Sequence, residues 1–171
     1  MSQVKRFDGP DLPMVNLHPG ELFVAREPTI ITTVLGSCVS VCLYCPRRRI
    51  GAMCHGVMPS RDERSPEDTF RFVDSSVSYM AQVLGREPES YSRSTLVAKL
   101  FGGADVLKAR GWSAAPSIGA QNIAAARQAL ERHGIGISAE RVGGKNGYRL
   151  YFYTQTGEVY VRMVKRSGGA E

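Results

Sequence analysis

The first third of the sequence carries three short apolar runs that are separated by turn-forming residues. The runs cover residues 29–35, 39–44 and 50–58, and the first is rich in β-branched types. Gly36 follows the first run, and Pro46 with three arginines follows the second. β-branched residues favour strands, whereas proline cannot continue a central ladder. The pattern therefore predicts three consecutive strands joined by short turns.

Two later segments have the spacing of amphipathic helices. Apolar residues at intervals of three and four predict one buried helical face, formed by Phe70, Val73, Val77, Met80 and Leu84. Residues 65–68 have the capping hydroxyl, proline and acids of a helix start, and Gly85 is a stop signal. A second helix is predicted over residues 119–133, with Gly134 as its stop. Its inward residues are Ile123, Ala126 and Leu130.

The remaining apolar runs predict further strands and complete the fold class. They cover residues 95–101, 135–142, 148–153 and 159–164, and the last two form a hairpin around Thr156-Gly157. Gly102-Gly103 lacks the spacing of a phosphate loop and predicts a tight turn or a close backbone approach. We therefore predict an α+β fold with mainly antiparallel β-sheets, sandwich-like, and two main helices packed on them.

The chain length and the ends of the sequence suggest how the domain is organised. The 171 residues favour one domain. Residues 1–20 are polar and proline-containing, which predicts an extended arm; residues 21–165 then form a single domain, and residues 166–171 a frayed tail.

Composition and charge narrow the location and the partners. No run of 18 apolar residues occurs and the N-terminus lacks an apolar leader, so we expect a cytoplasmic protein that does not insert into membranes. The net charge of +6 favours an acidic partner. Basic residues do not interleave with aromatics as in an RNA-binding sheet, so nucleic acid is not the expected partner.

Four cysteines, Cys38, Cys42, Cys45 and Cys54, fall within one short segment. A reducing compartment disfavours a disulfide framework, which leaves a metal site or a nucleophile. Cys42, Cys45, Cys54 and His55 offer four zinc ligands. Adjacent residues of a strand point to opposite faces, however, so Cys54 and His55 do not easily bind one ion. We expect no bound metal.

Cys38 follows the Gly36-Ser37 break directly, which suggests a nucleophile. Such a turn can present a side chain at the end of a strand and leave backbone N–H groups free to stabilise an oxyanion. A thiol needs a base or cation nearby to act as a nucleophile, and His55 on the third predicted strand is the natural candidate. The alternative interpretation is that Cys38 is a small buried apolar residue.

Five motifs in order give the chain a resemblance to a known family. They are Thr32–Tyr44 with Leu-Gly-Ser-Cys, Gly51–His55, Lys99–Ala104, Ile118-Gly119 with Asn122, and Val142–Gly144. The match that contains them runs in order over roughly residues 20–165, and the first motif is the most specific. In these motifs the chain resembles the CheD family of chemoreceptor glutamine deamidases.

The resemblance implies a Cys-His-Thr triad and no cofactor. The cysteine of the motif matches Cys38 and the histidine matches His55. The threonine six residues before the cysteine matches Thr32 rather than Thr33. From the residue types themselves, we expect His55 to lower the pKa of the Cys38 thiol, and backbone N–H groups around Gly36 and Ser37 to hold the oxyanion.

Three positions depart from the usual pattern of the family. Cys45, Cys54 and Met58 stand where family members often carry Asp, Asn and Leu. None of them is a member of the implied triad, so the departures concern substrate contacts and rate.

The resemblance also implies an activity and partners. CheD enzymes hydrolyse glutamine side chains on the cytoplasmic helical bundle of chemoreceptors, and they bind CheC-type phosphatases. Other interpretations stay open: a catalytically weak adaptor that binds the receptor or CheC, a cysteine hydrolase with another substrate, or a zinc-stabilised binding module.

Overall fold

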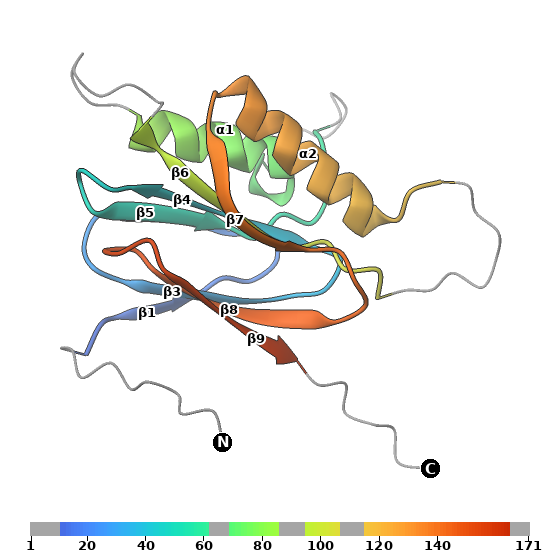
Figure 1. Ribbon diagram of the computed structural model, residues 1–171, viewed down its shortest axis with the longest axis horizontal. Helices are drawn as coiled ribbons and strands as arrows, with labels where there is room; N and C mark the ends of the chain where they lie inside the picture. The colour runs from blue at the N-terminus through green and yellow to red at the C-terminus, as the bar shows by residue number, and fades with distance from the viewer. Residues whose placement is uncertain (1–10, 62–68, 86–94, 107–114, 165–171) are drawn as a thin grey trace, which may run out of the picture.

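The computed structural model describes residues 11–61, 69–85, 95–106 and 115–164. Two β-sheets pack face to face, and two helices cover the outer face of one of them (Figure 1). Sheet A has the strand order β1 (Met14–Asn16), β3 (Ile30–Leu35), β8 (Gly147–Tyr153), β9 (Val159–Val164). Sheet B has the order β2 (Leu22–Ala25), β5 (Ile50–Cys54), β4 (Val39–Cys45), β6 (Val97–Gly102), β7 (Gly136–Val142).

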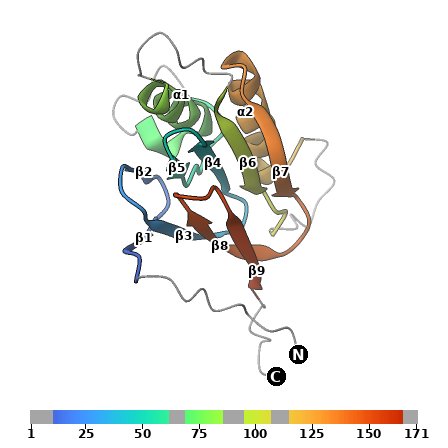
Figure 2. The same cartoon turned by 60° about the vertical axis from the view of Figure 1, so that its left-hand side comes forward.

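The predicted α+β class is confirmed, and sheet B is the middle layer (Figure 2). In the described part of the chain, the parallel pairs are β1–β3 and β6–β7, and the other neighbours are antiparallel. Consecutive strands β3 and β4 belong to different sheets. The Gly36–Cys38 turn between them therefore crosses from one layer to the other.

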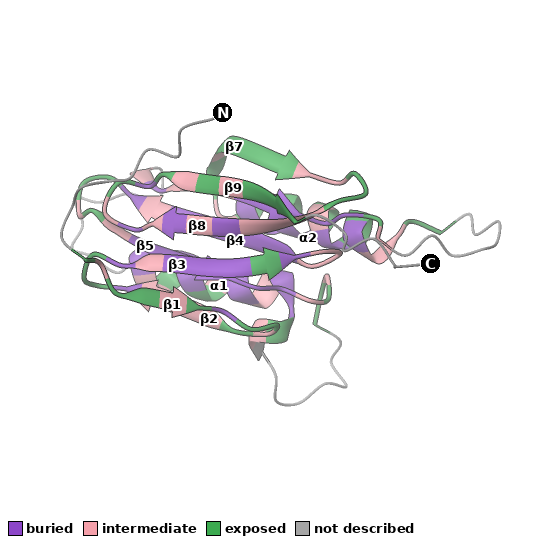
Figure 3. Cartoon of the chain, turned by 90° about the horizontal axis from the view of Figure 1, so that it is seen from below, coloured by how far each residue is buried: buried purple, intermediate pink, exposed green. Residues whose placement is uncertain are grey.

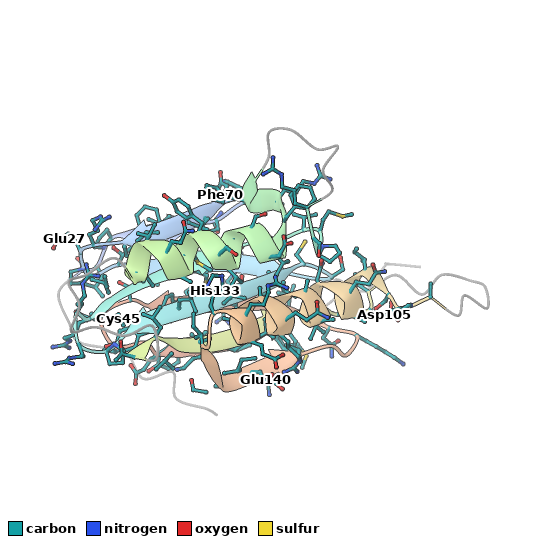
Figure 4. The ribbon with its side chains drawn as sticks, turned by 90° about the horizontal axis from the view of Figure 1, so that it is seen from above. Glu27, Cys45, Phe70, Asp105, His133 and Glu140 are labelled. Carbon is teal, nitrogen blue, oxygen red and sulfur yellow. The ribbon has the colours of Figure 1, made fainter. Side chains whose placement is uncertain are left out.

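The helices lie on the side of sheet B that faces away from sheet A. Helix α1 (Val73–Leu84) follows a short 3-10 turn, η1 (Thr69–Arg71), and helix α2 (Ile118–Arg132) packs beside it. Figure 4 shows the two helices side by side, and His133 at the end of α2 contacts Ser78 of α1. Neither described helix is long and apolar enough to cross a membrane.

The ends of both helices follow the sequence signals only in part. The buried stripe is confirmed for Val73, Val77, Met80 and Leu84, but α1 begins at Val73, so Phe70 lies before it in η1 and is half-buried. The expected start at residues 65–68 lies outside the described residues. At the start of α2, the Ser117 hydroxyl accepts a hydrogen bond from the Ala120 N–H at 3.1 Å. Gly134 has φ +66°, a conformation that favours glycine, and ends α2 as predicted.

Strand alternation divides sheet B between two cores. In β4, Val39, Val41 and Leu43 pack against the helices, whereas Cys42 packs against sheet A. Seen from below, β3 is mostly buried and the edge strands β1 and β9 carry the exposed residues (Figure 3). The inner core between the two sheets is the layer in which the candidate site lies.

Three features differ from the sequence expectations. Met14–Asn16, inside the expected N-terminal arm, pairs with β3, and β2 is a strand that the sequence analysis did not predict. The third predicted strand ends at Cys54 rather than at residue 58 and continues only as isolated bridges at Gly56 and Met58. The expected tail, residues 166–171, lies outside the described residues.

Candidate active site

The Gly36–Cys38 turn is held through its three carbonyl groups. The Gly36 carbonyl accepts from the Ala104 N–H at 2.9 Å, and the Cys38 carbonyl accepts from the Gly103 N–H at 2.8 Å. The Ser37 carbonyl accepts from the Asn122 side chain at 3.1 Å. Within the described residues, no acceptor contacts the Ser37 N–H. The turn is therefore fixed on its carbonyl side and keeps an N–H free for a ligand.

Gly102 and Gly103 allow this close approach. Gly102 has φ +98°, and a Cβ at this position would overlap the Cys38 carbonyl oxygen. Gly103 has φ +69°, and its Cβ would lie 2.5 Å from Ile123 Cγ1 of helix α2. The prediction of a tight turn or close backbone approach is confirmed, since both glycines have left-handed backbones and lie against other segments.

Cys38 is half-buried and directly precedes β4. Burial raises the pKa of its thiol above the ordinary value, and its own backbone N–H lowers that pKa in part. The expected lowering of the Cys38 pKa is therefore wrong for the free protein. The resting side chain is a neutral thiol at neutral pH.

His55 lies on the same face of sheet B as Cys38. The β4–β5 register pairs Cys42 with Met53, and an isolated bridge pairs Val39 with Gly56. This register sets Ser40 opposite His55 and makes Cys38, two residues before Ser40 and directly before β4, the diagonal neighbour of His55. Diagonal neighbours on one face of a sheet can interact when one side chain is long. The structure thus brings the two sequence-predicted residues to one place.

One hydrogen bond fixes the tautomer of His55. The Thr33 hydroxyl donates to the Leu17 carbonyl at 2.8 Å and lies 2.7 Å from His55 Nδ1. A hydroxyl has one proton, so Thr33 must accept the second hydrogen bond from Nδ1–H. The tautomer assigned from this network leaves Nε2 unprotonated. Nε2 is then the nitrogen that can take a proton.

Burial keeps this imidazole neutral. It lowers the pKa of His55 to about 4; the Glu21 carboxylate raises that pKa in part, and His18 lowers it. The turn that carries His18 and Glu21 is hydrogen-bonded to the backbone of His55. The Gly20 N–H donates to the His55 carbonyl, and the His55 N–H donates to the Glu21 carbonyl, each at 2.9 Å. Cys38 and His55 are therefore both neutral at pH 7, rather than a thiolate and an imidazolium.

Thr32 was expected to orient the imidazole through its hydroxyl or its backbone carbonyl, and among the described residues neither group contacts His55. Its Oγ1 is buried and has no hydrogen-bond partner among the described residues, and its carbonyl accepts from the Leu17 N–H at 2.8 Å. Thr33 contacts the imidazole instead, because strand alternation turns Thr33 of β3 toward sheet B together with Ile31 and Leu35. Thr32 is connected to the imidazole only indirectly. Its carbonyl binds the Leu17 N–H, and the Leu17 carbonyl binds the Thr33 hydroxyl that contacts His55.

The other cysteines are buried on two different faces of sheet B. Cys42 packs in the inner core, and Cys45 and Cys54 pack under the helices. Burial raises the pKa of Cys42 well above its ordinary value and that of Cys54 to about 11. No group of three or more metal-ligating side chains gathers in the part of the chain that the structure describes.

Sequence reasoning missed two parts of this site. The segment from Leu17 to Glu21 lies against His55, although its sequence indicates only an arm. Asn122 was noted only as part of a motif, yet its buried amide contacts the nucleophile turn. A polar residue in the first turn of an amphipathic helix is an ordinary feature, so its sequence carried no signal of this contact.

The fold and the site define a class: an α+β sandwich that carries a half-buried cysteine and a buried histidine on the inner face of sheet B. Comparison with known proteins adds the family. The model of CheD, described as chemotactic sensory transduction, matches residues 57–163. The chain belongs to the CheD family.

Curated relatives match along almost the whole chain. Probable chemoreceptor glutamine deamidase CheD 2 of Geobacter sulfurreducens is 41% identical over 92% of this chain and 94% of its own. CheD 2 of Geobacter metallireducens is 42% identical over 90% of this chain and 95% of its own. CheD 1 of Anaeromyxobacter dehalogenans is 39% identical over 88% of this chain and 84% of its own. These two are also named as probable chemoreceptor glutamine deamidases.

Proposed function

We propose that this protein hydrolyses glutamine side chains of chemoreceptors to glutamate and releases ammonia, with Cys38 as nucleophile. The names of the relatives support the substrate and the reaction. The observation that carries the chemistry is the Thr33–His55 hydrogen bond, which leaves Nε2 of a buried, neutral imidazole on the face that Cys38 shares.

In the first half of the reaction, the Cys38 sulfur attacks the side-chain amide carbon of glutamine. His55 Nε2 takes the thiol proton during the attack, since both groups are neutral at rest. The Ser37 N–H, which is free within the described residues, stabilises the negative charge on the amide oxygen. The protonated imidazole then gives its proton to the leaving nitrogen, ammonia departs, and a thioester joins Cys38 to the substrate.

In the second half, water replaces ammonia as the partner of His55. Nε2 takes a proton from the attacking water, the carbon–sulfur bond breaks, and the sulfur regains its proton from the imidazole. Glutamate leaves, and the neutral pair is restored. Thr33 keeps Nδ1 protonated throughout, so Nε2 serves as base and acid in turn.

The partners follow from the same proposal. The helical bundle of a chemoreceptor is the substrate, and the net charge of +6 favours an acidic surface. On the family resemblance alone, we also propose that the protein binds a CheC-type phosphatase.

The test is ammonia release from receptor cytoplasmic fragments, with mass spectrometry to locate glutamines converted to glutamate. We expect activity in the wild type and in Cys45→Ala, and none in Cys38→Ala. Cys45 is the matched control because it is a buried cysteine at the last position of β4, on the face of sheet B that packs against the helices.

Two outcomes would contradict the proposal. If a folded Cys38→Ala variant released ammonia at the wild-type rate, Cys38 would not be the nucleophile. A wild type that binds the fragments and releases no ammonia would favour the adaptor interpretation, which the raised thiol pKa also fits.

A further inference from the structure

Asn122 is a fully buried amide in the first turns of helix α2. Its Nδ2 group donates to the Ser37 carbonyl at 3.1 Å and to the Val57 carbonyl at 3.0 Å. In Figure 1, α2 begins at the same end of the molecule at which β6 finishes. The side chain therefore reaches from the helix layer to the end of sheet B that holds the candidate site.

The two carbonyls belong to the two segments that carry the reactive pair. Ser37 directly precedes Cys38, and Val57 follows His55 by two residues. The only backbone bridge between these segments in the described residues beyond strand β5 joins Val39 to Gly56. One NH₂ group thus ties the nucleophile segment to the base segment at a point where the regular ladder has ended.

The chemistry of this contact requires an amide. Both protons of the NH₂ group are used, one for each carbonyl, and a carboxylate at this position would have no proton to give. Helix α2 is fixed at the required depth, because a Cβ at Gly119 would lie 2.6 Å from the Gly103 carbonyl carbon. Gly103 in turn holds the Cys38 carbonyl.

Stability alone does not account for Asn122. Its Oδ1 is buried and has no hydrogen-bond partner in the described part of the chain. A buried polar atom without a partner weakens a fold, and such an atom in a native protein calls for an explanation. The two donated hydrogen bonds, both made to the segments of the reactive pair, supply it.

We propose that Asn122 is a positioning residue for the deamidation, which holds the Cys38 turn and the His55 segment in their reactive relation. The proposal rests on the proposed function for its kinetic part. Its geometric part, the placement of the Cys38 thiol, can be measured without any substrate.

Three variants separate the amide from the space that it fills. Asn122→Asp keeps the shape and removes the donors, Asn122→Ala removes the side chain, and Asn122→Ser keeps one donor. Gln121→Ala is the matched control, since Gln121 is the exposed neighbouring amide, and its Nε2 contacts only the Pro116 carbonyl among the described residues.

We expect kcat to fall about 100-fold in Asn122→Asp and Asn122→Ala, the size of loss that a misplaced reacting group causes, with KM little changed. Asn122→Ser should fall in between, and Gln121→Ala should match the wild type. Because partial unfolding would also lower the apparent kcat at constant KM, each kcat is calculated per folded enzyme, with the folded fraction taken from the urea unfolding curve of that variant.

Iodoacetamide labelling, read by mass spectrometry for each cysteine, gives the second readout. We expect Cys38 to react faster at pH 7–8 in Asn122→Asp, because a loosened turn exposes the thiol. The buried Cys42, Cys45 and Cys54 should stay unlabelled, whereas global unfolding would label all four cysteines.

Each outcome decides the matter. Folded Asn122 variants with wild-type kcat and wild-type labelling overturn the proposal. If all three variants fail to fold, Asn122 is a component of the fold rather than of the site, and the proposal is also overturned. If the wild type releases no ammonia, the proposed function fails, while selective labelling of Cys38 in the variants still supports the positioning role.

Discussion

Replacing each of two adjacent threonines by valine should have opposite effects. Thr33→Val removes the hydroxyl that bonds both His55 Nδ1 and the Leu17 carbonyl. Thr32→Val removes a hydroxyl that is buried and has no partner among the described residues. Valine has nearly the shape of threonine, so the pair of substitutions compares one hydroxyl with its neighbour on the same strand.

The magnitude for Thr33→Val follows from the groups left behind. The Leu17 carbonyl and the His55 Nδ1–H both belong to buried residues, and each would lose this partner. A buried group without its hydrogen bond costs about 1–3 kcal/mol, so the two predict a loss of roughly 2–4 kcal/mol after relaxation. At about 2–4 °C per kcal/mol for a chain of this size, Tm should fall by roughly 5–15 °C.

Thr32→Val should leave stability unchanged or raise it by up to about 1 kcal/mol, because it removes an unsatisfied buried hydroxyl. Turnover should follow the same division. Thr33→Val frees the imidazole to rotate and to exchange tautomers, so kcat should fall about tenfold or more. Loss of a general base lowers the rate about 10²–10⁴-fold, so kcat should fall further in His55→Ala than in Thr33→Val.

Thermal and urea unfolding give the stabilities, and ammonia release gives the rates. The reasoning would be refuted if Thr32→Val lost activity and Thr33→Val kept both its activity and its Tm. That result would show that Thr32 orients the imidazole, and that the hydrogen bond between Thr33 and His55 contributes nothing to activity or stability in solution.

Three further predictions concern charge and metal. Iodoacetamide labelling of Cys38 should rise with pH as a single curve with its midpoint above that of an ordinary thiol, because burial raises the pKa; a labelling plateau from pH 5 to 8 would instead indicate a thiolate–imidazolium pair. The unfolding free energy should decrease as the pH falls from about 6.5 to about 4, because the unfolded chain takes up a proton on His55 that the folded chain refuses; His55→Gln should lack this component in urea titrations at each pH. Purified protein should hold no stoichiometric zinc by elemental analysis, and a chelator should not lower its Tm; one tightly held equivalent would contradict this.

Much of the fold could be predicted because its elements have strong local signals. β-branched runs between glycine and proline marked β3 and β4, and the apolar stripe marked α1. Strands β1 and β2 were not predicted, since they are three and four residues long and too short to show a period. Their place in the sheets depends on pairing with distant strands, which a local pattern does not contain.

The choice between Thr32 and Thr33 shows the same limit at the site. In β3, Ile30 and Val34 share one face with Thr32, and Ile31 and Leu35 share the other with Thr33. Both faces are about equally apolar, so alternation did not reveal which one looks toward sheet B. Packing against sheet B determines that Thr33 contacts His55. The family pattern, in which the threonine lies six residues before the cysteine, pointed to Thr32 instead.

The neutral state of the pair has a consequence for the rate. When His55 takes the Cys38 proton, a charged imidazolium forms at a site that is 3% exposed. Thr33 offers it a hydroxyl and no charge, and Glu21 is the carboxylate that opposes the effect of burial on the His55 pKa. A buried aspartate in the position of Thr33 would stabilise that charge directly, as in the serine protease triad. Here the proton must pass quickly to the leaving nitrogen, so the barrier lies in forming the charge, and we expect slower turnover than that of enzymes with an acidic third residue.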